Sequence, residues 1–512
     1  MQRICLAPVV LALVVAPLAA CGSDDSGDDD QPSCEPPQGE LPTDGAFADP
    51  MALPLANCVE GGLVDLPGRW FVHAPDRVFT FDYPKFEGTC ETGFHRAFFR
   101  EEDHDINDDG RTFFSWSDGT RYYHRTFARF QTDSGTFEFA SAFAACMQPD
   151  GTLAAVTGRF DTDRGEAIFP EVGTRFGLKD APAEGIELVG EFGMAPDHDV
   201  IGYNVVVDAG TAYVVGQNGL DIISVANPAA PVHVASVPGA FNDVRIVRSA
   251  TKVVAYVSPI EQENTKFIDV TNPAAPVVLG ELPEYSHSLQ IAIEGPKTML
   301  YLATYTDQIP KYDVTDPTNP MRLGAAVVPG EQAGIHDLTV DGTRIYANNT
   351  TAGVVAIDTA AGLTSAVEVG RLQTSYSHAG WVGAAGGRAV YLHGDEGMTG
   401  TPDGGAFMRV FDGDPSSPTY MTVIGKYQSR PEVGIHNFEL HDNLAYIAYY
   451  QDGVRIVDMS DPTQPREVAH FNTWDPETAP GGAFEGALGI RLVDGLIYVA
   501  ELERGLLILR KL

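Results

Sequence analysis

Positive charge is scarce in this sequence. The 512 residues include 33 Lys and Arg against 70 Asp and Glu, so the formal net charge is −37. Proteins that bind nucleic acid or an anionic membrane surface hold the phosphates with a basic patch. Because few basic residues are available to build such a patch, the composition argues against both classes of partner.

Familiar catalytic motifs are also missing. The chain contains no GxSxG nucleophile elbow, no HExxH zinc helix and no glycine-rich phosphate loop. With 44% hydrophobic and 10% aromatic residues, the composition is otherwise that of a globular protein. A catalytic or binding site must therefore be argued from residues that lie far apart in the sequence.

Cysteine is rare, with six residues in the chain. Cys5 lies in an apolar N-terminal run and Cys21 follows that run. The other cysteines are Cys34, Cys58, Cys90 and Cys146. They have no CxxC spacing that would indicate a metal site. In an oxidising compartment they predict two disulfides, with three connectivities open.

The amino terminus has the order of a secretory signal. Arg3 precedes an apolar run over residues 4–18, which ends in the small residues of Leu-Ala-Ala-Cys. This order predicts a signal peptide over residues 1–20. Its end on Cys21 is similar to a bacterial lipobox, which implies cleavage before Cys21, acylation there, and an anchor in the cell envelope, at the outer membrane or the cell surface. An ordinary signal peptide is the alternative.

Residues 21–50 are mostly Asp, Ser, Gly, Pro and Gln, with few large apolar side chains. Such a segment cannot bury enough apolar surface to offset the entropy lost on ordering. We expect a disordered tether here, followed by a small domain at 51–180 and a larger one at 186–512.

The segment 51–180 predicts a small antiparallel β domain. Apolar and polar residues alternate in runs such as RVFTFDY from Arg77 and TRYYHRTFARF from Thr120. Asp-Gly pairs between the runs favour tight turns. The pattern therefore indicates a β sandwich or a small barrel that carries the disulfides.

One stretch of this segment has the spacing of half a calcium loop. Asp105, Asn107 and Asp109 would direct alternate side-chain oxygens at one centre, and Gly110 would allow the sharp turn. Trp116 stands where an EF-hand has its closing Glu. The alternatives are thus a Ca²⁺ site and a plain acidic β-turn.

A repeated phrase fills residues 186–512. Clear copies read GLDIISVANPAAP from Gly219, KFIDVTNPAAP from Lys266, KYDVTDPTNP from Lys311 and GVRIVDMSDPTQP from Gly453. Each is an apolar strand that ends in Asn-Pro or Asp-Pro, a pair typical of a turn between strands. Another hairpin precedes each copy. Four short strands at a period of about 40–58 residues predict the blades of a β-propeller.

Counting the outermost strands predicts an all-β, seven-bladed propeller. The predicted outer strands are Ile186–Phe192, Val232–Val237, Val277–Leu282, Met321–Val328, Ala366–Leu372, Met421–Tyr427 and Glu467–Phe471. The first of these precedes its own blade, and the strands at the chain end have no outer strand after them. We therefore predict that IELVGEF pairs with GLLILRK and closes the ring, which removes the exposed sheet edges.

The phrases GLDIISVANP and GVRIVDMSDP, and more loosely GVVAIDT, resemble the LVIVD-repeat family. The resemblance implies a bacterial surface or secreted propeller over residues 186–512. It implies no activity, because such repeats are scaffold and function resides in a site placed on the scaffold.

Four histidines occupy the same position of successive repeats. His287, His336, His378 and His436 each follow an outer strand and precede an inner one. In a propeller this point lies at the rim of the central channel. Because imidazole is a common transition-metal ligand, the four predict a site for Cu, Zn or Fe, or for a polar ligand. The alternative is a structural role, in which each ring bonds the backbone of the neighbouring blade.

Two functions from different classes follow from these patterns. The first is a surface-anchored lipoprotein whose propeller is a binding or interaction module for an unidentified protein or small molecule. The alternative is a metal-dependent propeller enzyme, an oxidoreductase or lyase, that uses the ring of histidines at the channel rim.

Overall fold

The computed structural model describes residues 45–65, 68–74, 77–83, 111–132, 135–162, 164–175, 177–260, 264–330, 334–374, 376–396, 406–431, 433–476 and 484–512. Several predicted features lie outside these ranges: the signal peptide 1–20, Cys21, most of the tether 21–50, Cys34, Cys90, Asp105, Asn107 and Asp109. The chain divides into two compact units. The first gathers residues up to 67 with 84–146 and 157–168, and the second gathers 68–83, 147–156 and 169–512.

The amino-terminal part of the described chain contributes one sheet of seven strands, in the order β2-β1-β7-β6-β5-β4-β3. The strands are β1 (Gly68–Ala74), β2 (Arg77–Tyr83), β3 (Arg111–Ser117), β4 (Tyr122–Thr132), β5 (Gly135–Met147), β6 (Leu153–Asp161) and β7 (Gly165–Arg175). Two 3-10 turns precede them, η1 (Pro50–Ala52) and η2 (Gly62–Asp65). A disulfide joins Cys58 to Cys146, which is one of the pairings that the sequence left open.

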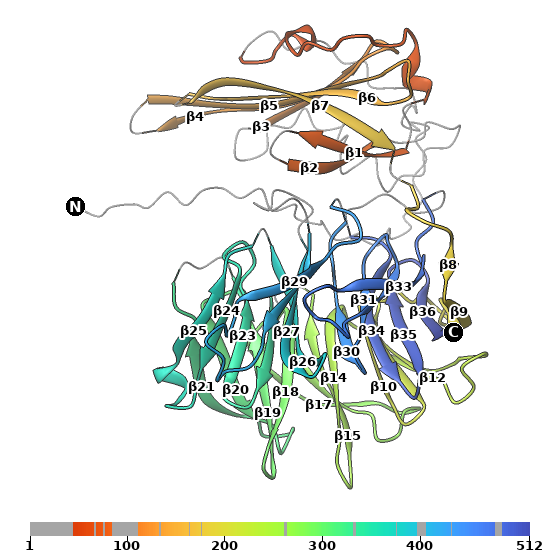
Figure 1. Ribbon diagram of the computed structural model, residues 1–512, viewed down its shortest axis with the longest axis vertical. Helices are drawn as coiled ribbons and strands as arrows, with labels where there is room; N and C mark the ends of the chain where they lie inside the picture. Colours follow the sequence, from red (N-terminus) through yellow and green to blue (C-terminus); the bar gives the residue numbers. More distant parts are fainter. Residues whose placement is uncertain are drawn as a thin grey trace, which may run out of the picture. The chain divides into compact units, whose positions relative to one another are not determined.

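Small sheets then follow one another along the chain (Figure 1). The first contains β10 (Asn204–Asp208), β11 (Thr211–Gly216), β12 (Gly219–Ser224) and β13 (Val232–Val237). The next two contain β14 (Phe241–Arg248), β15 (Val253–Pro259), β16 (Thr265–Asp269) and β17 (Val277–Leu282), then β18 (Ser288–Glu294), β19 (Lys297–Ala303), β20 (Gln308–Asp313) and β21 (Met321–Val327). In each, neighbours in sequence are neighbours in the sheet.

The later sheets repeat this order. They contain β22 (Asp337–Asp341), β23 (Arg344–Asn348), β24 (Val354–Asp358) and β25 (Val367–Leu372); β26 (Ser377–Ala385), β27 (Arg388–Asp395), β28 (Met408–Asp412) and β29 (Val423–Tyr427); β30 (Phe438–His441), β31 (Leu444–Ala448), β32 (Val454–Asp458) and β33 (Arg466–Phe471); and β34 (Ala487–Val493), β35 (Leu496–Glu501) and β36 (Gly505–Lys511). Strand β8 (Ala183–Glu184) adds to β33, and β9 (Ile186–Phe192) adds to β36. The 3-10 turn η3 (Leu363–Ser365) precedes β25.

The repeated Asn-Pro and Asp-Pro pairs form the turns that the sequence predicts. In the first two sheets, the backbone nitrogens of Ala230 and Ala275 donate to the carbonyls of Asn227 and Asn272, at 3.0 and 2.9 Å. Such a bond across four residues closes a β-turn. Proline at the second position sets the backbone angle that this turn needs, so the phrase ends one strand and starts the next.

Apolar side chains of adjacent sheets form common cores. Val215 and Leu220 of the first sheet pack in one cluster with Val244 and Val257 of the second. The repeated phrase forms the third strand of a sheet, and β12 is buried along nearly its whole length, which explains its continuous apolar run. The region 186–512 is therefore all-β, with small sheets packed face to face.

No helix within the described residues is long and apolar enough to cross a membrane.

Candidate metal and ligand site

The four predicted histidines occupy one position at the start of successive inner strands. The backbone nitrogens of His287, His336 and His436 donate to the carbonyls of Ala303, Asn348 and Ala448, at 2.7, 2.8 and 3.0 Å. In each case the acceptor is at the end of the second strand of the same sheet. The hairpin ladder therefore holds these three histidines at the same end of their sheets, and His378 is the second residue of β26.

The structure brings the four imidazole rings together. The ring centroids of His287 and His336 are 3.9 Å apart, those of His336 and His378 are 4.5 Å apart, and those of His378 and His436 are 4.5 Å apart. The rings follow one another in the order of their sheets. They form one cluster of contacting side chains and not isolated positions of a repeat.

Two of the rings also bond the backbone of the neighbouring sheet. The Nδ1 atom of His378 donates to the carbonyl of His436 at 2.9 Å, and Nδ1 of His436 donates to the carbonyl of Leu488 at 2.9 Å. A carbonyl can only accept, so the proton of each neutral ring is on Nδ1. Both rings therefore have the structural role that the sequence left open, a bond to the neighbouring backbone. This bond uses Nδ1 and leaves a lone pair on Nε2.

A carboxylate that the sequence analysis missed joins this cluster. Glu396 follows β27 and is 9% exposed. One of its oxygens lies 3.6 Å from Nε2 of His336, and the other lies 3.7 Å from Nε2 of His378. The hydroxyl of Tyr450 donates to this carboxylate. Glu396 does not occupy the repeated position, so no sequence signal pointed to it.

Burial sets the protonation of these groups. It lowers the pKa of His287 and His436 to about 3 and that of His378 to about 4, and neighbouring imidazoles add to the effect for His287 and His436. Burial together with the other rings lowers the pKa of His336 well below its usual value. The rings are therefore neutral at pH 7, which is the form that binds metals. Burial raises the pKa of the Glu396 carboxyl.

Tyrosine rings surround the imidazoles. Tyr305 lies 5.0 Å from His287 and 5.4 Å from His336 between ring centroids, Tyr376 lies 5.6 Å from His336, and Tyr450 lies 5.3 Å from His436. These aromatic rings lower the local dielectric constant, which strengthens any charge interaction among the imidazoles.

Two cavities adjoin the histidines and share lining residues. The smaller has a volume of about 30 Å³ and is lined by the four histidines. The larger has a volume of about 410 Å³ and extends along the inner strands past Trp381 and Arg491. Arg245, Asp337 and Asn437 line both cavities. The larger cavity is thus next to the histidine-lined one, although none of the four histidines lines it.

Charged groups of both signs line the larger cavity. Arg245 donates to the carboxylate of Asp243, and Arg491 lies 3.4 Å from the carboxylate of Glu439. Asp337 accepts from the hydroxyl of Ser288 at 2.7 Å. Burial raises the pKa of Asp337 to about 6, and the nearby carboxylate of Asp243 contributes. The cavity thus suits a polar ligand that can offer both donors and acceptors.

The sheets without a histidine at this position contribute differently. The amide nitrogen of Asn242 lies 3.2 Å from Nε2 of His287 and donates to the carbonyl of the same residue at 2.9 Å. Leu488 offers its carbonyl to His436. His198, which is close in sequence to the first of these sheets, bonds Asp221 at 3.1 Å instead and does not join the cluster.

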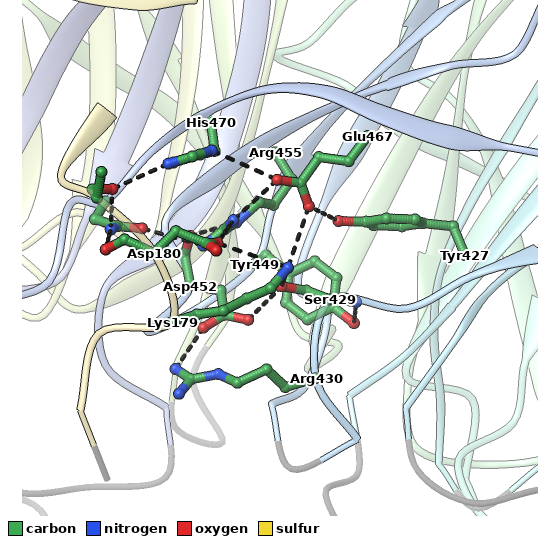
Figure 2. Close-up of polar contacts among 12 residues, drawn as sticks. Lys179, Asp180, Tyr427, Ser429, Arg430, Tyr449, Asp452, Arg455, Glu467 and His470 are labelled. Carbon is green, nitrogen blue, oxygen red and sulfur yellow. Dashed lines mark hydrogen bonds and ion pairs between the residues drawn. The ribbon is translucent and has the colours of Figure 1, made fainter. Parts of the chain in front are cut away.

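A second group of potential metal ligands, shown in Figure 2, is an ion-pair network. Atoms of Asp180, Glu467 and His470 lie within 4.8 Å of one another. Arg455, which is fully buried, extends into this group and places Nη1 2.6 Å from Asp180 and 3.1 Å from Glu467. Because Arg455 and Lys179 already pair with both carboxylates, we assign the group a structural role.

Comparison with known proteins identifies the repeats. Residues 203–238 and 437–473 match the model of the LVIVD repeat. No curated protein matches the chain.

Solved structures give distant similarities. The WD40 β-propeller domain of Doa1 has 11% identity and a TM-score of 0.43, covering 64% of this chain and 97% of that one. The protein YCF48 bound to D1 peptide has 11% identity and a TM-score of 0.42, covering 66% and 97%. BamB from Moraxella catarrhalis has 11% identity and a TM-score of 0.39, covering 62% and 84%. These scores are too low to assign the chain to any of these proteins. Two stretches of the chain, residues 203–238 and 437–473, are LVIVD repeats, and they lie in small sheets of four and five strands.

Proposed function

We propose that the protein is a lipid-anchored propeller of the bacterial envelope that binds a polar ligand in its central channel. In this proposal the acyl groups on Cys21 attach the chain, residues 21–50 space it from the membrane, and residues 186–512 form a closed ring of seven blades.

The contacts of the two chain ends of the propeller support the closed ring. Strand β9 pairs with β36, and the pairing shifts register between Ile508 and Leu509. The pairing of β12 with β13 shifts in the same way between Ile222 and Ile223. Val205 of the first sheet also shares a core with Leu506 of the last. We infer that β9 is the outer strand of the last blade and that this blade packs on the first.

One observation carries the binding proposal. Polar side chains from several sheets converge on a cavity of about 410 Å³ that shares lining residues with the cavity of the four histidines. A concave site of this size with a few convergent polar groups is typical of small-molecule binding. An aromatic wall at Trp381 and the guanidinium groups of Arg245 and Arg491 suit a flat or carboxylate-bearing molecule.

A cavity-filling substitution tests the binding proposal. Gln290 lines the larger cavity, so Gln290→Trp should fill it without removing an ion pair. Native mass spectrometry of protein released gently from membranes should show an added mass in the wild type that this variant lacks. Gln308→Trp makes the same change at an exposed position and should keep the added mass. Equal added mass in both variants would place the ligand elsewhere.

A metal-dependent enzyme is the second candidate. The observation that favours it is the buried carboxylate of Glu396 beside His336 and His378, because a carboxylate with two imidazoles is a common ligand set of catalytic metals. The fate of the ligand distinguishes the two candidate functions. A binding module retains its ligand unchanged, whereas an enzyme converts it.

A further inference from the structure

We propose that His336, His378 and Glu396 bind one divalent first-row transition-metal ion, with His436 available as a further ligand. This inference rests on the proposed binding function of the channel and names a ligand at its histidine end. The ion would occupy the space between the Nε2 atoms of His336 and His378 and the carboxylate of Glu396.

The distances between these atoms suit an ion and not hydrogen bonds. The separations of 3.6 and 3.7 Å from Glu396 to the two Nε2 atoms exceed the range of a hydrogen bond. Metal bonds to nitrogen and oxygen are about 2.0–2.2 Å, so the ligand atoms of a tetrahedral site lie about 3.3–3.6 Å apart. Both separations from Glu396 are therefore near those that a bound ion would impose, and the ligand atoms of the three residues all lie within 4.8 Å of one another.

Hydrogen bonds to backbone carbonyls fix which nitrogen of His378 and of His436 can bind a metal. Because His378 and His436 donate from Nδ1 to carbonyls, their Nε2 atoms carry the lone pairs. Metal-bound histidines usually have such a partner on the other nitrogen, and it fixes both tautomer and ring orientation. In His336, the buried Nδ1 atom has no hydrogen-bond partner among the described residues. The backbone therefore fixes the tautomer of His378 and His436 but not that of His336.

The charge balance of the cluster favours a cation. Glu396 is buried, and within the described part of the chain its ion-pair contacts are only with histidines. A buried carboxylate without a full positive charge is costly. A divalent ion would supply the positive charge that the cluster lacks.

The donor atoms narrow the identity of the ion. Imidazole nitrogens with one carboxylate suit Zn²⁺, Cu²⁺, Ni²⁺ or Fe²⁺. Ca²⁺ and Mg²⁺ prefer oxygen ligands and would be poorly held here. The cavity of about 30 Å³ beside the rings is roughly the volume of one water molecule. An exchangeable ligand there would face the larger cavity through the shared residues Arg245, Asp337 and Asn437.

Metal analysis of the full-length protein tests the site. Wild-type protein stripped with a chelator and titrated with Co²⁺ should bind about one ion and show visible absorption bands of cobalt with nitrogen ligands. The double variant His336→Ala, His378→Ala should weaken Co²⁺ binding by at least about 100-fold. The near-isosteric Glu396→Gln should also weaken binding and tests the site if the double variant does not fold. His441→Ala removes a half-exposed histidine that bonds Glu439, and it should bind Co²⁺ as the wild type does.

A positioning residue gives a subtler readout. Tyr450→Phe removes the hydroxyl that donates to Glu396, so Co²⁺ affinity should fall about 10-fold with altered cobalt bands but unchanged stoichiometry. Wild-type protein that binds no Co²⁺, or a folded double variant that retains full affinity, would overturn the metal site. An added organic mass in native spectra without metal would leave the binding function standing and remove only this inference. Co²⁺ binding without an added organic mass would support the metal site and remove the proposal that the channel binds an organic ligand.

Discussion

The imidazole of His378 serves two purposes with its two nitrogens. Nδ1 donates to the backbone of the next sheet, and Nε2 faces Glu396. A repeated histidine can therefore stabilise the junction between sheets and still present a lone pair to a ligand. The structural and the functional interpretations of this position, which the sequence set against each other, describe different atoms of one ring.

Burial of single histidines also makes stability depend on pH, and His124 in β4 allows a clean test. Burial lowers its pKa from 6.5 to about 4. Between these values the unfolded chain binds a proton that the folded chain does not, so the free energy of unfolding falls as pH falls from 6.5 towards 4. The full loss in unfolding free energy is about 3 kcal/mol, and no stability is lost above pH 6.5, the pKa of this histidine in the unfolded chain.

His124→Gln should flatten part of this dependence. We expect the difference in unfolding free energy between pH 7 and pH 4.5, measured by urea titration, to be smaller in the variant than in the wild type. Matching pH profiles for the two proteins would show that His124 takes up its proton without unfolding.

At the scale of elements, the segment that leads into β8 is held by ion pairs with the β30–β33 sheet. Arg455 reaches Asp180 on this segment, and Lys179 lies 3.3 Å from Glu467 (Figure 2). Arg430 also donates to the carbonyl of Gly177 at 2.8 Å. Because Arg455 is buried, the loss of either acidic partner leaves part of its charge uncompensated.

Asp180→Asn should therefore destabilise this part of the chain. We expect a cost of about 1–2 kcal/mol, less than the roughly 3–5 kcal/mol of a fully buried pair. The side chain of Asp180 is 32% exposed, and Glu467 still pairs with Arg455. Glu187→Gln breaks the exposed pair with Arg510 and should cost under about 1 kcal/mol. Thermal unfolding of the two variants measures the difference in stability loss. Equal losses would show that the Arg455 network stabilises the chain no more than an exposed ion pair does.

The outer strands lie against turns of neighbouring sheets, and glycine makes this possible. A Cβ at Gly190 in β9 would lie 2.0 Å from the carbonyl oxygen of Pro228, and one at Gly425 in β29 would lie 2.2 Å from that of Pro462. The same close approach therefore joins the last sheet to the first and the fifth sheet to the sixth. This repetition supports the proposed ring.

Gly190→Ala should weaken the contact between the last and the first sheet. The added methyl group meets backbone, which cannot yield as a side chain does, so we expect a loss of about 1–3 kcal/mol in unfolding free energy. Gly177→Ala is the matched control, because a Cβ there meets no atom within 4 Å. Identical melting temperatures for both variants would argue against the closed ring.

At the scale of the whole molecule, the proposed anchor depends on one residue. Cys21→Ser should move the protein from the membrane fraction to the soluble fraction, because acyl chains would be its apolar attachment and the net charge of −37 disfavours anionic lipid. Mass spectrometry of the wild type should show the mass of a lipid-modified Cys21. Unmodified wild-type protein, or a Ser variant that stays with the membranes, would refute the lipoprotein proposal.

Much of the fold could be predicted because its signals are local. The Asn-Pro turns and the alternating strands lie within single repeats, and the structure has four-stranded sheets where they predict them. Errors occurred at strand ends. The sequence predicted an outer strand from Met421, but β29 begins at Val423, because Met421 has a φ of 60° and belongs to the preceding turn. The disulfide partner of Cys58 could not be predicted, since cysteine spacing does not encode pairing.

The sequence by itself determined the repeat, the series of small sheets and the common position of the four histidines, because each depends on residues close together in the chain. Only the tertiary structure decided which nitrogen of His378 and of His436 is free, and only it placed Glu396 beside His336 and His378 and Asp180 beside Arg455. Those contacts join residues from different sheets or distant segments. Their distances depend on how whole sheets pack, and no local pattern of residues records that packing.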